Sequence, residues 1–488
     1  MILVLISVSC EREVSVTPPD IPPANGSILI RSIPEEANIF MNGRDRRRLT
    51  PDSIKWLDTG DYEITLKKEF FRDTTFIVHV EEGEQSEIFV DYYSNPAMLG
   101  DIQCISLPAE AFIMIDDSIT THTTPYTFTD LIPGYHKIEY TMTDHRAVEL
   151  NVAVASSETT IAQAALVDTT IWMDYNVWNN AIPTNTLTCI LSASGPRGAL
   201  WIGTYDTGLI KYVNGDWVKY DETNSAISDN QINCLEQDSM GNIWIGTMNG
   251  LTQIVPNILH TAARKDDDVT QWNFRNSPLL SMQINDVGIS DGNNVWFATE
   301  IGIINLLISD SFYWGQPSSS STSDLPDDRT TAFAVDGINK YVGTKAGGFV
   351  RFANPQNMTV YTTGNGLFRN SISAITIDDD GNAWVGHDAA IGVTGGLSKF
   401  NGVSWENLSH MIYGEDVNVI YVDSKNRKWI GTDRALYLIT NFVNSGEFTY
   451  DNVGLNLSNV TGVTEDKDGI IWISTFGNGM FRMNVNNL

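Results

Sequence analysis

The sequence is poor in cysteine and in basic residues. Its four cysteines are scattered along 488 positions, which argues against a disulfide scaffold or a zinc cluster built from paired cysteines. Acidic residues outnumber basic ones by 60 to 30, and the net charge of −30 argues against a nucleic acid partner, because phosphate binding needs concentrated Lys and Arg. Beyond residue 10, no stretch is long and apolar enough to span a bilayer.

Common catalytic motifs are missing as well. The sequence contains no Gly-rich phosphate loop, no H-E-x-x-H and no G-x-S-x-G. Acidic turns that begin at Asp378 and Asp466 start like calcium loops, but neither has the far bidentate glutamate of an EF-hand loop, and the same turn recurs at Asp238. We expect hairpin turns at these places, no metal site and no cofactor.

The chain instead repeats one short motif seven times: an aromatic residue, a β-branched or aromatic residue, a small residue and, in six copies, threonine. Subtracting successive positions gives spacings of 43, 52, 45, 43, 45 and 43, a period typical of repeat folds. The aromatic residues are Trp201, Trp244, Trp296, Tyr341, Trp384, Trp429 and Trp472. Cys189 and Cys234 also stand 45 apart, so we expect them to fill the same core slot in neighbouring repeats rather than to form a disulfide.

The repeat around Trp244 predicts a meander of four short strands. A glycine turn at Gly241 and the dipeptide Asn249-Gly250 separate the first three strands, and a fourth is clearest after Asn214-Gly215 in the preceding copy. Both faces of the central strand carry apolar or small groups. Sheets stacked radially bury both faces, and the motif glycine lets the next sheet approach closely. We therefore predict an all-β fold with a seven-bladed β-propeller over residues 168–488.

The last repeat ends soon after its third strand and lacks a fourth strand of its own. The stretch that begins at Trp172 matches the fourth-strand stretch that begins at Trp217, with an offset of 45. We expect a strand at about residues 170–177 to complete the last blade, so that the ring closes without a covalent bond and leaves no exposed edge. The alternative is that this segment is a linker.

These repeats resemble the propeller repeats in the sensor regions of bacterial hybrid two-component regulators. The shared pattern is N-x-I-x-x-I, then D-x-x-G-N-x-W-I-G-T, then G-L. Its residues here are Asn230, Ile232, Leu235, Asp238, Gly241, Asn242 and Trp244, and again Asn370, Ile372, Ile375, Asp378, Gly381, Asn382 and Trp384. The resemblance implies a propeller fold, but propellers host binding, signalling and catalysis alike.

Residues 26–167 contain an internal duplication at a constant offset of 74. Alternating apolar and polar residues, broken by tight turns, predict two small β-sandwiches at residues 26–94 and 95–167. The matched landmarks are Ser32, Pro34, Ala37, Thr50 and Gly60 in the first copy, and Ser106, Pro108, Ala111, Thr124 and Gly134 in the second. They resemble the landmarks of PEGA domains, which implies a spacer or surface-binding module of a bacterial envelope protein and brings no catalytic residues.

The N-terminus looks like the end of a bacterial lipoprotein signal peptide. An apolar run ends in the small Ser9 and is followed by Cys10, and residues 11–25 form a Pro-rich linker. We expect residues 1–10 to be a signal segment with lipid attached at Cys10, which would hold the protein at a membrane of the cell envelope. The alternatives are ordinary secretion and a plain disordered tail.

His387 stands where the other six motif copies have threonine, and Asp388 follows it. A histidine paired with a carboxylate can act as a general base. The fold alone also resembles the streptogramin lyases, seven-bladed enzymes that use a histidine with glutamates and magnesium. Neighbouring repeats supply no accompanying cluster of His and Glu, so the default interpretation is a hydrogen-bonded histidine at a strand end.

Loops on a rigid propeller are where binding tends to lie. Two insertions interrupt the period, one at residues 256–268 and one at residues 314–329, and the second is Ser-rich and is expected to be a flexible loop. Tyr313, Trp314 and Trp178 are candidates for contact with a glycan or peptide; the alternative is plain packing.

Arg44, Arg46, Arg47 and Arg48 crowd an expected hairpin end of the first small β-sandwich. A basic cluster on an acidic protein can contact anionic lipid head groups or a cell-wall polymer. The alternative is a solvated loop without a partner.

Together these features predict an exported, lipid-anchored envelope protein whose propeller binds a ligand, or an envelope protein, peptide or glycan partner, without catalysis. Two alternatives stay open: a lyase or hydrolase with His387 in its site, and a purely structural envelope protein. Convergence of His387 with two or more carboxylates at one mouth of the ring would favour the enzyme.

Overall fold

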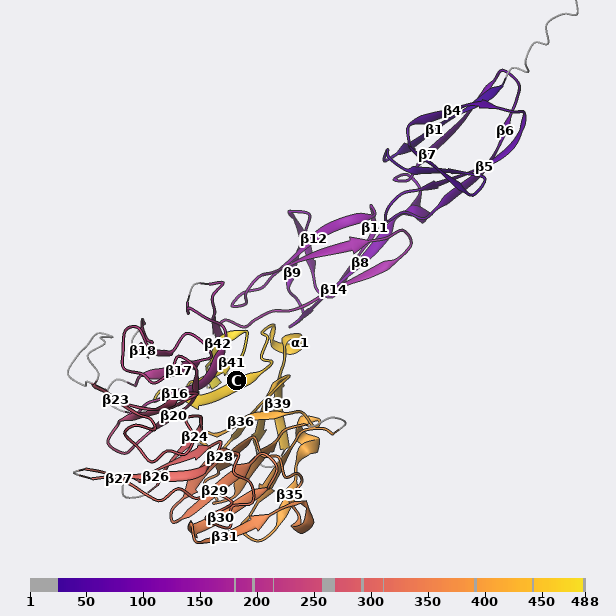
Figure 1. Cartoon of the computed structure of the whole chain (residues 1–488). Coiled ribbons are helices and arrows are strands. Elements are labelled where there is room, and N and C mark those ends of the chain that lie inside the picture. Colours follow the sequence, from indigo (N-terminus) through magenta and orange to yellow (C-terminus); the bar gives the residue numbers. More distant parts are fainter. Residues whose placement is uncertain are drawn as a thin grey trace, which may run out of the picture. The chain divides into compact units, whose positions relative to one another are not determined.

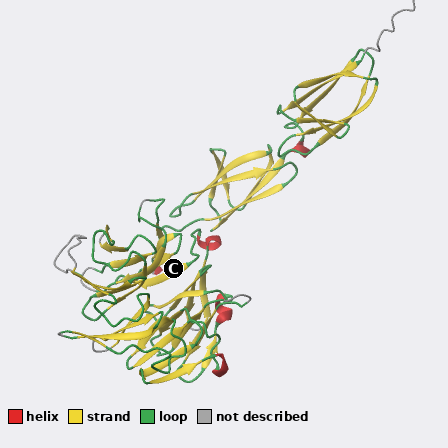
Figure 2. Cartoon of the chain, in the orientation of Figure 1, coloured by secondary structure: helices red, strands yellow, loops and turns green. Residues whose placement is uncertain are grey.

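The computed structural model describes residues 25–179, 181–194, 198–213, 215–256, 268–290, 294–309, 311–389, 393–440 and 443–485. The chain divides into two compact units, Met1–Met142 with Ala147–Ala164, and Thr143–Arg146 with Ala165–Leu488. The regular secondary structure of both units is almost entirely β-strand (Figure 2). Cys10 with the expected signal segment, most of the expected linker, and residues 257–267 of the first insertion lie outside the described residues.

The first unit contains two copies of one seven-stranded arrangement. Numbered within each copy, the strands form a three-stranded sheet of order 4-1-7 and a four-stranded sheet of order 3-2-5-6. The first copy contains β1 (Gly26–Ile33), β2 (Asn38–Met41), β3 (Arg44–Leu49), β4 (Asp52–Leu57), β5 (Gly60–Lys67), β6 (Thr74–Val80) and β7 (Gln85–Asp91). The second contains β8 (Gly100–Leu107), β9 (Phe112–Ile115), β10 (Ser118–Thr123), β11 (Tyr126–Leu131), β12 (Gly134–Thr141), β13 (Val148–Val154) and β14 (Thr159–Ala165).

The landmarks shared by the two copies form the same buried contact in each. The Ser32 hydroxyl donates to Pro34 O at 2.7 Å and lies 2.5 Å from the Thr50 hydroxyl, which accepts from Ala37 N at 3.0 Å. The corresponding residues of the second copy are Ser106, Pro108, Thr124 and Ala111. The offset of 74 therefore reflects one packing solution used twice.

In its described residues the second unit contains seven four-stranded antiparallel sheets (Figure 1). The first is β16 (Leu187–Ser192), β17 (Leu200–Thr204), β18 (Leu209–Val213) and β19 (Asp216–Tyr220); the second is β20 (Ile232–Gln237), β21 (Ile243–Thr247), β22 (Gly250–Val255) and β23 (Asp268–Trp272); the third is β24 (Ile284–Ser290), β25 (Asn294–Thr299), β26 (Gly302–Ile308) and β27 (Phe312–Trp314). The fourth is β28 (Thr330–Asp336), β29 (Asn339–Thr344), β30 (Phe349–Asn354) and β31 (Asn357–Tyr361); the fifth is β32 (Ala374–Ile377), β33 (Ala383–His387), β34 (Gly396–Phe400) and β35 (Trp405–Asn407); the sixth is β36 (Val417–Val422), β37 (Lys428–Thr432), β38 (Leu436–Thr440) and β39 (Val443–Phe448).

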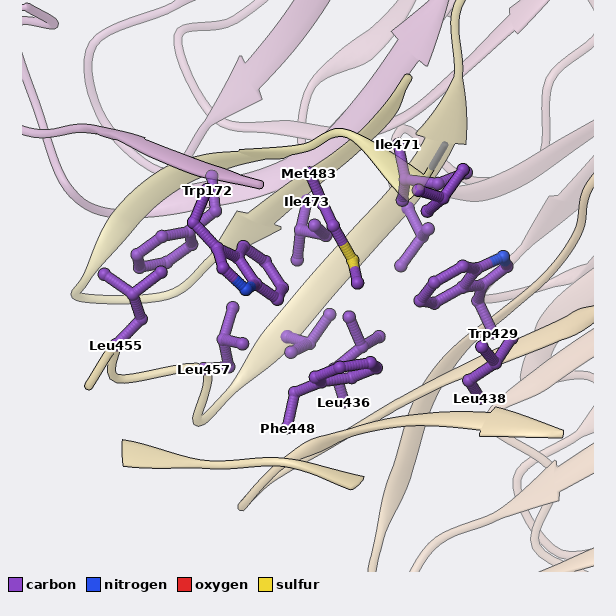
Figure 3. Packing of buried hydrophobic residues seen from close by; sticks show 14 of the residues in the cluster. Trp172, Trp429, Leu436, Leu438, Phe448, Leu455, Leu457, Ile471, Ile473 and Met483 are labelled. Carbon is purple, nitrogen blue, oxygen red and sulfur yellow. The ribbon is translucent and has the colours of Figure 1, made fainter. Parts of the chain in front are cut away.

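The seventh sheet combines β40 (Val460–Glu465), β41 (Ile471–Thr475) and β42 (Gly479–Met483) with β15 (Trp172–Tyr175), which precedes the first sheet in the chain. β15 pairs with β42 from Trp172 opposite Met483 to Tyr175 opposite Met480. Trp172 packs in one buried cluster with Met483 and Phe448 (Figure 3). Short helical turns occur at η1 (Pro96–Met98), η2 (Thr363–Asn365), η3 (Ser409–Ile412) and α1 (Tyr450–Val453).

Neighbouring sheets contact one another through their first strands. β16 contacts β20, and the series continues through β24, β28, β32 and β36 to β40, which contacts β16. Polar side chains reinforce these contacts by donating to a carbonyl of the next first strand. The donors and acceptors are Thr188 to Ile232, Asn233 to Ile284, Asn285 to Thr330, Thr331 to Ile372 and Thr461 to Leu187, at 2.6–2.9 Å. The last of these joins the seventh sheet to the first.

The motif glycine is needed because the next sheet lies directly against it. A Cβ at Gly203 would collide with the Cys189 sulfur and with Ile232 of the next sheet, and Gly246 stands in the same relation to Cys234. Both thiols are free and fill equivalent slots of the first and second sheets. The predictions about the glycine and about the two cysteines are confirmed.

The acidic turns are hairpin turns, as predicted, and each holds the motif tryptophan. In four sheets an aspartate six residues before the tryptophan accepts from the indole Nε1 at 2.8–2.9 Å and from amides of its own turn. The pairs are Asp238 with Trp244, Asp378 with Trp384, Asp423 with Trp429 and Asp466 with Trp472. Trp201 and Trp296 lack this aspartate, and their buried indole N–H groups find no hydrogen-bond partner among the described residues.

The Ser-rich insertion is hydrogen-bonded into the third sheet rather than left as the flexible loop that its composition predicts. Ser318 forms an antiparallel bridge with Ile303, and both Ser318 and Ser319 are buried. Ser319 N donates to the Thr322 hydroxyl at 2.9 Å, so hydroxyl groups replace the strand ladder as backbone partners here. In the part of the chain that the structure describes, no helix is long and apolar enough to cross a bilayer.

Candidate ligand-binding face

The threonine that ends the repeated motif fixes the hairpin between the second and third strands of a sheet. Its hydroxyl donates to a carbonyl at the start of the third strand or just before it, at 2.7–2.9 Å, in six sheets. The donors are Thr204, Thr247, Thr299, Thr344, Thr432 and Thr475. A short hydrogen-bonded hairpin of this kind holds the residue that follows the threonine in a defined position.

That following residue is anchored a second time, through its backbone. In five sheets its N–H donates to the carbonyl of the residue that precedes the first strand, at 2.9–3.2 Å. We define the threonine-end face by these residues, one from each sheet: Tyr205, Met248, Glu300, Lys345, Asp388, Asp433 and Phe476. In the five sheets with this second hydrogen bond, the backbone is fixed at both sides and the side chain stands on a rigid frame.

One arc of the threonine-end face is apolar and exposed. Tyr205, Met248 and Phe476 are 48%, 36% and 41% exposed and come from the first, second and seventh sheets, which are neighbours. The rings of Tyr205 and Phe476 meet edge to face with centroids 5.6 Å apart. An aromatic pair that spans two sheets and remains in water offers an apolar contact surface to a ligand.

The rest of the face is charged. Lys345 of the fourth sheet and Asp388 of the fifth form an ion pair at 2.6 Å. Glu415 accepts from the Thr432 hydroxyl at 2.6 Å, and burial raises the pKa of its carboxyl group. Asp433 adds a further exposed carboxylate. The face thus combines an aromatic arc with an arc of fixed charges.

His387 does not project onto this face. Its side chain is fully buried; Nδ1 donates to Ser371 O at 3.1 Å, so Nε2 accepts from the Ser398 hydroxyl at 2.8 Å. Burial lowers the pKa of His387 to about 4, which keeps the ring neutral near pH 7. Asp388 pairs with Lys345 instead. This geometry is that of the hydrogen-bonded strand-end histidine described above as the default.

The three aromatic candidates lie in different surroundings. Trp178 is 72% exposed, and its turn is tied to the apolar arc: Asn185 accepts from Val177 N through its side chain and from Gly477 N through its carbonyl. Tyr313 is 59% exposed on the outer strand β27 of the third sheet. Trp314 is half-buried and packs on Trp272 and Phe297. The candidates therefore do not converge on one site.

Two carboxylates that the sequence did not single out lie on first strands. Asp286 occupies the slot that Cys234 holds in the preceding sheet, and it accepts from Val287 N at 2.9 Å and from Phe333 N of the fourth sheet at 2.7 Å. Glu236 lies on β20. Although both residues keep some solvent exposure, burial of their carboxylates raises the pKa of each to about 7. Among the described residues, no three His, Cys, Asp or Glu side chains are placed to hold a metal ion.

Comparison with protein families identifies parts of both units. Residues 25–92 match the family model of the PEGA domain. Residues 226–249 and 454–477 match the family model of the two component regulator propeller; these segments belong to the second and seventh sheets with the turns that precede them. No curated protein matches the chain.

Several solved structures are similar to this chain at low sequence identity. The extracellular domain of a protein described as the hybrid two component system BT3049 of B. thetaiotaomicron aligns with a TM-score of 0.53 and 14% identity, over 87% of this chain and 60% of that one. A streptogramin B lyase aligns with a TM-score of 0.46 and 15% identity, over 64% of this chain and 97% of that one. PorZ, a surface component of the type-IX secretion system of Porphyromonas gingivalis, aligns with a TM-score of 0.46 and 13% identity, over 91% of this chain and 65% of that one. At these identities the similarity concerns the fold alone.

Proposed function

We propose that this chain, which carries a PEGA domain and two component regulator propeller repeats, is an exported envelope protein that presents a seven-bladed propeller to a ligand or protein partner. The seven sheets are the blades, and β15 closes the ring by pairing with β42. The second copy in the first unit is a second PEGA-like module, supported by its identical strand order. Cys10 carries the lipid that anchors the protein to a membrane of the envelope.

Recognition takes place on the threonine-end face. The observation that carries this proposal is the exposed pair of Tyr205 and Phe476, which spans two sheets and is held on backbone fixed by hydrogen bonds. Aromatic rings stack on apolar side chains of a peptide or on the faces of sugar rings at low cost in conformational entropy. The charged arc around Lys345 and Asp388 orients the polar groups of the same ligand.

A non-catalytic role is supported by the state of His387. A general base needs a basic nitrogen within reach of the substrate proton. Here both ring nitrogens are engaged by Ser371 and Ser398, and the side chain is fully buried. The buried and hydrogen-bonded state of His387 therefore argues against this residue as a general base.

The test compares two pairs of exposed aromatic residues. The double variant Tyr205→Ser with Phe476→Ser is expected to lose at least ten-fold in affinity for any glycan or peptide that shifts the melting temperature of the parent protein. The matched control is Tyr313→Ser with Phe312→Ser, because both residues are exposed on the outer strand β27. Trp178→Ser is measured separately, because its turn is tied to the arc.

Two outcomes would contradict the proposal. If no member of a glycan and peptide panel shifts the melting temperature and none is turned over, the structural role is favoured. If turnover is found and His387→Ala abolishes it without unfolding the protein, the enzyme is favoured. The anchor is tested separately: Cys10→Ser should move the protein from the detergent phase to the aqueous phase.

A further inference from the structure

The first unit carries a basic surface that has no part in the proposed binding to the threonine-end face. β3 is an edge strand of its sheet, and all six of its residues are exposed. Arg48 pairs with Asp52 at 3.0 Å. The guanidinium groups of Arg44, Arg46 and Arg47 have no hydrogen-bond or ion-pair partner among the residues that the structure describes. They form a local positive surface on a protein whose net charge is −30.

The fold does not require these arginines, because the second copy builds the same strand without them. β10 occupies the place of β3, at the edge next to the second strand of its copy, and both strands show a register shift at the same place. At the offset of 74, Ser118, Thr120 and Thr121 stand in the places of Arg44, Arg46 and Arg47. Uncharged residues therefore allow the same strand pairing in the second copy, so the pairing of β3 does not require the arginines.

Trp56 departs from the second copy in the same way. Its side chain is 82% exposed, and its backbone has a φ of 63°, a left-handed conformation that suits Asp, Asn or Gly better than a bulky residue. The corresponding residue in the second copy is Asp130, with a φ of 58°. Neither packing nor backbone conformation explains a tryptophan at this position.

Trp56 and the start of β3 lie at the same end of the first copy. Trp56 is the extra residue opposite the Gly26–Ser27 step, where the described chain begins. The β2–β3 hairpin points to this end as well, because Asn42 N donates to Glu63 O near the start of β5, and β5 follows β4 after a short turn. An exposed tryptophan and unpaired arginines thus share one end of the module.

We propose that this surface, Arg44, Arg46, Arg47 and Trp56, binds the anionic head groups of a phospholipid bilayer. The guanidinium fork matches phosphate oxygens, and tryptophan partitions into the head-group region of a bilayer. The acidic remainder of the protein does not prevent this contact, because charges further than about 10 Å from the surface are screened at ordinary ionic strength. The contact is made by the folded module and does not depend on a lipid at Cys10.

The experiment uses the full chain with Cys10→Ser, so that no acyl group contributes. Co-sedimentation is measured with vesicles of phosphatidylcholine alone and of phosphatidylcholine with phosphatidylglycerol at 7:3, in low and high salt. Binding is expected only to the anionic vesicles and should weaken as salt rises. Each arginine contributes about five-fold to partitioning. The triple variant Arg44→Ser, Arg46→Thr and Arg47→Asn should therefore bind on the order of 100-fold more weakly. The first two residues are those of β10, and asparagine tolerates the φ of 53° at position 47.

The control variant removes three exposed cations from the second unit: Lys219→Ser, Arg275→Ser and Lys467→Ser. It should sediment like the parent protein, and both variants should keep the parent melting temperature. Equal losses in the two variants, or equal binding to neutral vesicles, would overturn the proposal. Binding of heparin or DNA without binding of vesicles would overturn it in favour of a soluble polyanion. None of these outcomes bears on the threonine-end face.

Discussion

The hydrogen bond between a turn aspartate and the motif indole makes a contribution to stability that can be isolated by mutation. Asp238 is 4% exposed and accepts from Trp244 Nε1 at 2.9 Å, Asn242 N at 2.9 Å and Asn242 Nδ2 at 2.8 Å. In Asp238→Ala the buried indole and the turn amide lose their acceptor. A buried donor left without its partner costs about 1–3 kcal/mol, so we expect the free energy of unfolding to fall by about 3–5 kcal/mol.

A double-mutant cycle separates the indole from the rest of the turn. Trp244→Phe removes the N–H group and keeps an aromatic ring, so Asp238→Ala should cost about 1–3 kcal/mol less in that background. Urea unfolding gives the free energies. Hydrogen exchange of the β21 amides reports the second sheet directly, which is needed because a chain of two units does not have to unfold in one step.

The converse change supplies the control. Ser290 stands six residues before Trp296, whose indole N–H has no partner among the described residues. Ser290→Asp is expected to stabilise the third sheet by about 1 kcal/mol. A coupling energy below about 0.3 kcal/mol in the cycle, together with no gain from Ser290→Asp, would refute the assignment of a stabilising role to the indole bond.

Three further outcomes are expected. Trp429→Ala should cost about 3–5 kcal/mol in urea unfolding because its ring is fully buried, whereas the exposed Trp178→Ala should stay within about 0.5 kcal/mol; equal effects would contradict the packing described. Deletion of residues 168–178 should speed amide exchange in β41 and β42 but not in β28–β31, and unchanged exchange around Trp472 would argue against closure by β15. Burial raises the pKa of Asp286 in the folded state to about 7, above an unfolded value of about 4, so ionisation of this carboxyl group opposes folding increasingly between these two pH values. The melting temperature of Asp286→Asn should therefore rise relative to that of the parent protein from pH 5 to pH 8. A difference that stays constant over this range would contradict the reasoning.

The repeated strands could be predicted because burial leaves a periodic trace in a sequence. Each motif residue has one local role: Trp244 fills the core, Gly246 allows the next sheet to approach closely, and Thr247 holds the hairpin by a hydrogen bond. Cys189 and Cys234 followed from the same period. The acidic turns were predicted as hairpins, and the pattern D-x-x-G-N-x-W already contains the step from Asp238 to Trp244. The hydrogen bond from the indole to this aspartate was not predicted.

The contacts between sheets could not be predicted because they join residues from different repeats. For example, Thr188 donates to Ile232 O, and the sequence around either residue does not indicate the other as its partner. Asp286 was missed for a related reason: it becomes conspicuous only when the first strands are aligned, where its counterpart in the preceding sheet is Cys234. The aromatic candidates illustrate the same limit. The sequence marks Trp178 and Trp314 as aromatic residues near loops. Only the structure shows that the Trp178 side chain is exposed and that the Trp314 side chain is packed.

The pairing of β15 with β42 also fixes the order in which the second unit can be completed during synthesis. β15 is the first strand of this unit to be synthesised, and its partner β42 follows all the other described strands. Trp172 therefore has no partner strand until nearly all other strands have been synthesised. Contacts between such distant segments form slowly, and an incomplete chain exposes apolar surface meanwhile. A premature stop at codon 479 would remove β42 and leave β15 permanently without its partner strand.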